Sequence, residues 1–134
     1  MRRNRGTLNG QLARVISETG HTDLLVVTDA GLPIPPGVER VDLAIRENLP
    51  RFLEVLDAVL DEVAVEDVLL AEEIKEAGPE MLEAIRERFA RLEVPLRFVP
   101  HTEFKQATAG ARAAVRSGEF TPYANVLLTA GVVY

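Results

Sequence analysis

Short apolar runs of strand length alternate with amphipathic stretches along the chain, and this alternation restricts the fold more than any other feature of the sequence. The clearest run covers residues 24–28 (LLVVT) and lies between two segments rich in turn-forming residues. An apolar run of this length, bounded by turn signals, is typical of a strand buried on both faces. Such strands belong to sheets that carry helices on both sides.

Similar runs predict further strands at 38–43, 65–70, 97–99 and 125–129. Between them, apolar residues recur at helical spacing. These stripes predict helices from an Asn9 cap to Gly20, from Pro50 to residue 63, from Pro79 to residue 92, and from a Thr102 cap to about residue 116, with Gly118 as its stop. The alternation predicts an α/β fold: a single domain over residues 1–134, with a central, largely parallel sheet and helices on both faces.

Composition and charge argue against several classes of protein. The net charge of −6 disfavours binding to nucleic acid, which normally requires a basic face. Arg2, Arg3 and Arg5 form a basic cluster, but its place at a chain terminus indicates a solvated end. The absence of cysteine excludes disulfides, thiol catalysis and thiolate metal sites. No apolar run approaches the roughly 20 residues that span a bilayer, and no signal peptide is evident, so we expect a cytoplasmic protein without membrane insertion.

The chain has two histidines, His21 and His101, and both stand where a predicted strand meets a loop. Histidine is the side chain whose unperturbed pKa lies between about pH 5 and 8. His21 follows Gly20, so we expect its imidazole near a helix C-terminus, where the dipole favours the protonated ring and suits a proton donor. A surface histidine in a connecting loop explains this pattern equally well. His101 either binds a ligand or simply begins a helix that Thr102 caps.

Polar side chains at other strand ends are further candidates. Asp29 follows the first predicted strand, where an aspartate often closes a turn on its own backbone. Tyr123 and Asn125 flank Ala124 before the last predicted strand, and they either close a turn or hold hydroxyl groups of a polar ligand. Glu73 follows the third predicted strand and could reach a site at its end, although charged side chains beside a sheet are usually solvated.

Cofactor and metal motifs are not found. The sequence has no Gly-x-Gly-x-x-Gly or Gly-Lys-Ser/Thr phosphate loop, so we expect no nucleotide cofactor. The two histidines lack the i, i+4 spacing of a helical metal site, so we expect no metal.

A set of short motifs occurs in a characteristic order along the chain. They are GHTD at 20–23, DAGLPIP at 29–35, AEEIK at 71–75, HTEFK at 101–105, RSGE at 116–119, PYAN at 122–125 and AGV at 130–132. Together they resemble the D-ribose pyranase family, within the group that also holds L-fucose mutarotase. The run at 29–35 resembles the ribose branch more than the fucose branch. The resemblance extends from Gly6 to Tyr134; Thr129 and Tyr134 depart from the pattern of some members, outside the catalytic motifs.

The resemblance implies a function and a site. Members of the family interconvert the β-pyranose and β-furanose forms of D-ribose without a cofactor, which supplies the furanose for ribose catabolism. The proton-donor histidine of the family falls on His21, and its sugar-binding positions fall on Asp29, His101 and the segment Tyr123, Ala124 and Asn125. The resemblance also implies a ring-shaped homo-oligomer, a pentamer or decamer, with sites built between subunits.

The chemistry agrees with the residues. Opening a cyclic hemiacetal delivers a proton to the ring oxygen and removes one from the anomeric hydroxyl, and reclosure reverses these transfers through another hydroxyl. A histidine does this well near neutral pH because both of its protonation states are populated. Asp29 and Asn125 would then hold the sugar. An L-fucose-type mutarotase and a non-catalytic sugar-binding subunit are the alternatives; measuring exchange between ring forms of several sugars separates the three.

Overall fold

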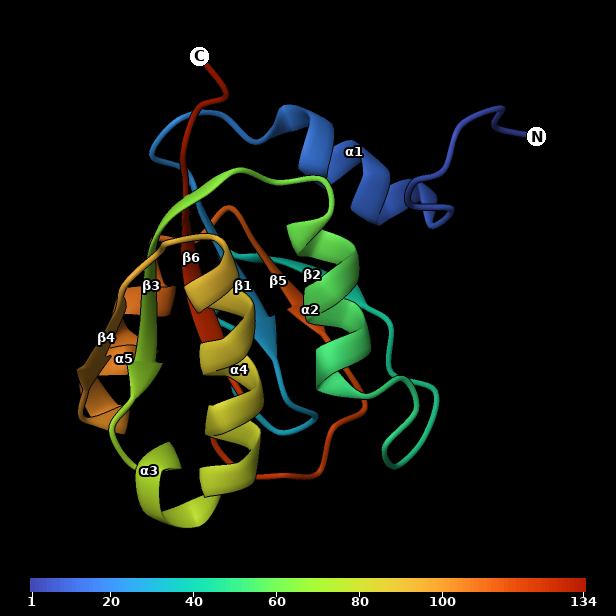
Figure 1. Cartoon of the computed structure of the whole chain (residues 1–134). Coiled ribbons are helices and arrows are strands. Elements are labelled where there is room, and N and C mark those ends of the chain that lie inside the picture. Colours follow the sequence, from blue (N-terminus) through green and yellow to red (C-terminus); the bar gives the residue numbers. More distant parts are fainter.

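The structure, a computed structural model, describes residues 1–134 and contains a six-stranded sheet with the strand order β2-β5-β1-β6-β3-β4 (Figure 1). The strands are β1 (Leu24–Thr28), β2 (Glu39–Asp42), β3 (Val65–Ala71), β4 (Leu96–Val99), β5 (Ala113–Arg116) and β6 (Val126–Ala130). The helices are α1 (Gly10–Glu18), α2 (Phe52–Leu60), α3 (Ile74–Ala77), α4 (Pro79–Arg91) and α5 (His101–Thr108). Not one of these helices has the length and apolar character needed to traverse a bilayer.

Parallel pairing predominates in the sheet. β1 and β2 both pair with β5 in parallel, and β3 pairs with β4 in parallel, whereas β6 runs antiparallel to β1 and β3. The predicted α/β fold with a largely parallel sheet is therefore confirmed. β6 is reversed because the segment 117–125, which joins it to β5, contains no crossover helix that would return the chain to the starting end of the sheet.

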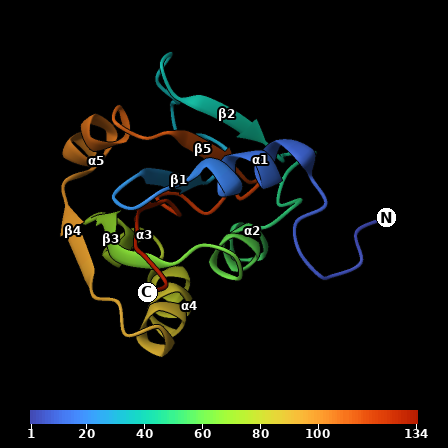
Figure 2. The same cartoon turned by 90° about the horizontal axis from the view of Figure 1, so that it is seen from above.

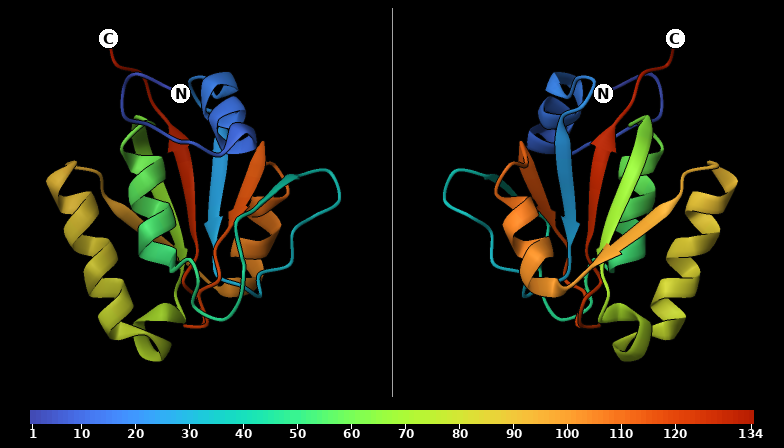
Figure 3. Two further views of the ribbon diagram at one scale, coloured as in Figure 1. Left: turned by 90° about the vertical axis from the view of Figure 1, so that its right-hand side faces the viewer. Right: turned by 90° about the vertical axis from the view of Figure 1, so that its left-hand side faces the viewer.

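The sheet separates two hydrophobic cores. Because successive strand residues point to opposite faces, Leu25 and Val27 of β1 pack in one core with α1, α2 and α4, and Val26 packs in the other with Phe104 of α5. Figures 2 and 3 show α2 and α4 on one face of the sheet and α5 on the other, as the sequence predicted. All three β1 side chains are at most 1% exposed, which explains the continuous apolar run.

The predicted helix from Thr102 to about residue 116 is wrong. α5 begins one residue earlier, with Pro100 as its N-cap, and ends at Thr108. The following residues include β5, which lies between β1 and β2. Its alanines have a high helix propensity, but pairing on both sides buries the strand and outweighs that preference. Gly118 consequently follows a strand and ends no helix.

The direction of the strands places different segments at the two ends of the sheet. At one end lie the segments that follow β1, β3, β4 and β5, together with the segment that precedes β6. At the other end lie the start of β1 and the C-terminal residues that follow β6. Figure 1 shows the C-terminus at the top and α3 at the bottom of this arrangement. The candidate residues are therefore divided between two ends of the molecule.

Candidate functional site

Asp29 and Asn125 form a hydrogen-bonded pair directly after β1 and before β6. The backbone N–H of Asp29 donates to Asn125 Oδ1 at 2.8 Å, and Asn125 Nδ2 donates to Asp29 Oδ2 at 3.3 Å. The other carboxylate oxygen, Oδ1, accepts the backbone N–H groups of Gly31 at 3.0 Å and Leu32 at 2.9 Å. Asp29 thus closes the turn on its own backbone, and the same bonds fix the orientation of its carboxylate.

Burial dominates the ionisation of Asp29. Loss of solvent raises the pKa of this carboxyl above its ordinary value, because burial disfavours the charged form. The N–H donors of Gly31, Leu32 and Asn125 and the positive charge of His101 act in the opposite direction. Because this electrostatic effect weakens with distance, the His101 imidazole lies close enough to Asp29 to affect the ionisation of the Asp29 carboxyl group.

His101 lies between two aromatic rings at the start of α5. Its imidazole stacks on Phe104, with ring centroids 6.3 Å apart, and meets the edge of Tyr123 at 5.0 Å. Its Nδ1 atom is buried and has no hydrogen-bond partner. A buried polar atom without a partner is costly, and keeping such an atom in the packed core costs stability that an ordinary core residue would not.

Tyr123 has a backbone conformation that its residue type rarely adopts. Its φ angle is 63°, in the left-handed region. Conformations of this kind cost about 1–3 kcal/mol and cluster at functional sites. Neighbouring Ala124 is fully buried, so its side chain cannot contact a ligand at the surface. The backbone of this segment instead places the Tyr123 ring against His101.

A cavity of about 380 Å³ opens beside Asp29. Its other lining residues are Ala30, Gly31, Arg116, Glu119, Phe120 and Pro122. Arg116 supports this wall, because its Nε donates to the Ala30 carbonyl oxygen at 3.0 Å and its guanidinium pairs with Asp42 at 3.1 Å. Arg116 and Phe120 were not predicted to line a site, although the motif at 116–119 contains Arg116.

His21 lies at the opposite end of β1 from Asp29. The strand between them has five residues, which span roughly 17 Å at about 3.3 Å per residue. The imidazole Nε2 lies 3.0 Å from Glu66 Oε2, and the His21 side chain is 51% exposed. The structure therefore brings Asp29, His101, Tyr123 and Asn125 together at one end of the sheet, and it does not bring His21 to them within one chain.

The surroundings of His21 are partly apolar. A cavity of about 290 Å³ includes His21, and its walls include the C-terminal residues Val132, Val133 and Tyr134. The last two of these are 90% and 100% exposed. Helix α1 ends at Glu18, two residues before Gly20. The direct partner of the His21 imidazole is the carboxylate of Glu66 and not the end of this helix.

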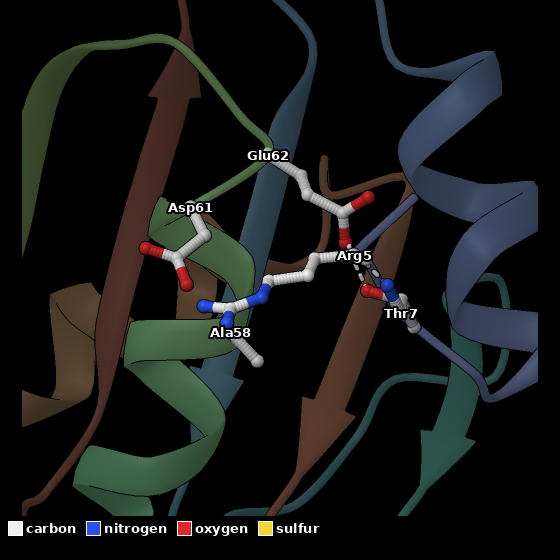
Figure 4. Close-up of a pocket in the computed structure, with 6 residues that line it drawn as sticks. Arg5, Thr7, Ala58, Asp61 and Glu62 are labelled. Atoms are coloured by element: carbon white, nitrogen blue, oxygen red, sulfur yellow. Dashed lines mark hydrogen bonds between the residues drawn. The ribbon is translucent and has the colours of Figure 1, made fainter. Parts of the chain in front are cut away.

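Another pocket, shown in Figure 4, contains none of the predicted site residues. It lies where the N-terminal segment meets the end of α2, and its volume is about 290 Å³. Arg5 extends toward Asp61, and the backbone N–H of Thr7 donates to Glu62 at 3.1 Å. The pocket is therefore the space that remains where the N-terminal segment packs against the end of α2. Neither this pocket nor any other part of the structure contains a group of three or more His, Asp or Glu side chains that could hold a metal ion.

Comparison with known proteins decides the family. The profile of the RbsD / FucU transport protein family matches residues 2–133. This chain belongs to that family. The D-ribose pyranase of Laribacter hongkongensis is 49% identical over 134 residues, which cover 100% of both chains. The D-ribose pyranase of Geobacillus thermodenitrificans is 48% identical over 132 residues, which cover 98% of each. The resemblance predicted from the motifs is thus confirmed.

Solved structures of RbsD / FucU proteins agree with this. The structure of Bacillus subtilis RbsD complexed with D-ribose matches with a TM-score of 0.94 and 41% identity, covering 99% of this chain and 100% of the other. FucU from Bifidobacterium longum matches with a TM-score of 0.78 and 25% identity, covering 95% and 97%. The chain is therefore more similar to this RbsD than to this FucU in both sequence and structure.

Proposed function

We propose that this protein is a D-ribose pyranase, an isomerase that interconverts the β-pyranose and β-furanose forms of D-ribose and supplies the furanose for ribose catabolism. The observation that carries the proposal is full-length similarity, at 48–49% identity, to proteins of that name. The match to an RbsD structure that contains D-ribose supports the same substrate.

The sugar site of this proposal is the end of the sheet that carries Asp29 and His101. The carboxylate of Asp29 accepts hydrogen bonds from sugar hydroxyls, and the half-buried imidazole of His101 bonds another. Tyr123 holds the imidazole from its edge. Asn125 is 1% exposed and its side chain is engaged with Asp29, so it acts on the sugar through that carboxylate.

His21 is the proposed proton donor, and it serves a site on a neighbouring subunit. Each subunit carries the histidine at one end and the sugar-binding residues at the other, so a head-to-tail contact unites them. Contacts between two different surfaces close into rings when the rotation permits. We expect such a ring, a pentamer or decamer, as the family resemblance implies.

Exposed apolar side chains lie near both halves of this proposed interface. Val132, Val133 and Tyr134 are exposed near His21, and Phe120, which lines the Asp29 cavity, is 59% exposed. Apolar surface of this kind favours association, because contact removes it from water. The sugar would then be enclosed where the two surfaces meet.

The reaction needs proton transfer and no change of oxidation state. His21 gives its proton to the ring oxygen while the bond between that oxygen and the anomeric carbon breaks. The anomeric hydroxyl loses its proton to water, which yields the open-chain aldehyde. Attack by a different hydroxyl closes the other ring, with the transfers reversed. Glu66 Oε2, at 3.0 Å from His21 Nε2, fixes the orientation of the imidazole.

Magnetisation-transfer NMR on D-ribose tests this function. We expect the wild-type protein to accelerate exchange between pyranose and furanose forms, and His21→Gln to lower that acceleration by about 10²–10⁴-fold, the usual contribution of a general acid–base group. Faster exchange of L-fucose would identify a fucose-type mutarotase. Ribose binding without exchange would identify a sugar-binding subunit, and wild-type rates in folded His21→Gln would exclude the proposed donor. The predicted cytoplasmic location remains a proposal, to be tested by cell fractionation.

A further inference from the structure

Glu73 contacts the backbone of His101, the residue whose half-buried imidazole packs against Tyr123. Both of its carboxylate oxygens accept the backbone N–H of His101, at 3.0 and 3.1 Å. The contact follows from the sheet, because Ala71 of β3 pairs with Val99 of β4 and the two chains leave the sheet side by side. The neighbouring backbone bond from Glu72 N–H to the Val99 carbonyl oxygen, at 2.7 Å, holds this junction together.

The start of α5 depends on this carboxylate. A helix leaves its first N–H groups without intrahelical partners, and a side chain at the N-cap usually satisfies one of them. The N-cap of α5 is Pro100, which makes no side-chain cap bond. Glu73 supplies the missing acceptor from another element, and the residue it binds is the one whose imidazole packs against Phe104 and Tyr123.

We propose that Glu73 is a positioning residue for the isomerase: by fixing the backbone of His101 it holds the imidazole in place against Phe104 and Tyr123. This inference rests on the proposed function. A displacement of about 1 Å at a catalytic site can cost on the order of 10²-fold in rate. A single backbone anchor at the first residue of α5 therefore affects turnover.

Two variants and a matched control test the proposal in protein that exchanges ribose. Glu73→Ala should lower kcat/KM for ribose exchange by roughly 10- to 100-fold. Glu73→Gln retains an oxygen acceptor and should stay within about threefold of wild type. Glu72→Ala is the control, because Glu72 is the adjacent acid and its side chain pairs only with Lys75, at 2.8 Å. It should exchange ribose at the wild-type rate.

A double-mutant cycle distinguishes positioning from general helix stability. If Glu73 acts through the imidazole, Glu73→Ala should cost less than about twofold in a His101→Asn background, because coupled residues are not additive. An equal loss in both backgrounds, or wild-type kcat/KM in Glu73→Ala, would overturn the proposal.

Glu73→Asp covers the case in which the alanine variant does not fold. Aspartate is a good N-cap for α3, but its carboxylate is one methylene shorter and loses the bond to His101. We expect the same fall in kcat/KM, and full activity in folded Glu73→Asp would also overturn the proposal. Failure of the proposed function itself would show differently, as wild-type protein without ribose exchange.

Discussion

Asp29 combines a structural and a proposed binding role in one carboxylate. Oxygen Oδ1 closes the turn through Gly31 and Leu32, and Oδ2 accepts the Asn125 amide. All of these partners are N–H donors, so they favour a carboxylate over a neutral amide at this position. From the sequence, turn closure and ligand binding were alternative roles for Asp29. The geometry permits both roles in the same residue, because the turn occupies Oδ1.

Asp29→Asn should therefore weaken ribose binding and lower stability together. The amide has one acceptor oxygen, and its NH2 group would face an N–H donor, so we expect about 1–3 kcal/mol loss in the free energy of unfolding. Ribose affinity, measured by calorimetric titration, should fall by about tenfold or more. Unchanged affinity with lowered stability would show that Asp29 is a turn residue only.

The raised pKa of Asp29 predicts a particular pH dependence of stability. A raised pKa means that the folded state binds the proton more tightly than the unfolded state does. The contribution of Asp29 to stability is therefore most favourable below its unfolded pKa of about 3.9 and falls as pH rises toward the folded value. In urea titrations at several pH values, the difference in unfolding free energy between wild type and Asp29→Asn should shrink as pH rises from about 4. A difference that grows over this range would contradict the burial argument.

At the scale of elements, the segment after β5 fastens the loop before α2. The backbone N–H of Gly118 donates to the Pro50 carbonyl oxygen at 2.8 Å, and the Asn48 N–H donates to the Gly118 carbonyl oxygen at 2.7 Å. A Cβ atom on Gly118 would lie 2.6 Å from the carbonyl oxygens of Arg46 and Leu49. Only glycine permits this approach of two backbones, so the residue is needed for packing and not as a helix stop.

Gly118→Ala should consequently destabilise the protein. Relieving the contact requires the backbone to move, and overpacking of this kind costs about 1–3 kcal/mol. Gly37→Ala is the matched control: a Cβ there meets nothing within 4 Å, and its effect should stay within about 0.5 kcal/mol. Chemical denaturation of both variants measures the difference. Equal free energies of unfolding for the two variants would show that the loop moves to accommodate the added Cβ atom without loss of stability.

At the scale of the whole molecule, the two halves of the proposed site lie at opposite ends of the sheet. The first is His21 with Glu66, and the second is Asp29 with His101. The rigid, buried β1 separates them, so no local rearrangement of loops would join them in one chain. The proposed function therefore requires a neighbouring subunit.

Mixing two inactive variants tests this dependence. His21→Gln lacks the donor and Asp29→Asn lacks the sugar-binding carboxylate, so each homo-oligomer should exchange ribose poorly. Mixed oligomers, formed by co-expression, contain some sites with both native residues, and activity should return in proportion to those sites. The control is a double variant, His21→Gln with Asp29→Asn, mixed with either single variant. Absence of recovery, or a monomeric mass by light scattering at micromolar concentration, would contradict a site shared between subunits.

The sequence by itself determined the features that depend on local pattern. The run 24–28 identified the central strand, because full burial on both faces demands continuous apolar residues. Asn9 identified the start of α1, since its side chain accepts the Leu12 N–H within the same turn. The order of the motifs identified the family. In each case the physical cause lies in residues that are close together in the sequence.

Tertiary structure alone decided the features that depend on distant partners. The residues of β5 form a strand because β1 and β2 pair with them on both sides, which no local propensity records. β6 runs antiparallel to β1 and β3 because the chain returns from β5 without a crossover helix. Glu73 reaches His101 because β3 and β4 pair in parallel and end side by side. The contact between Asn125 and Asp29 likewise follows from the pairing of β6 with β1. The pairing and direction of strands depend on contacts between segments that are remote in the sequence. The hydrophobic periodicity of a single segment therefore does not predict them.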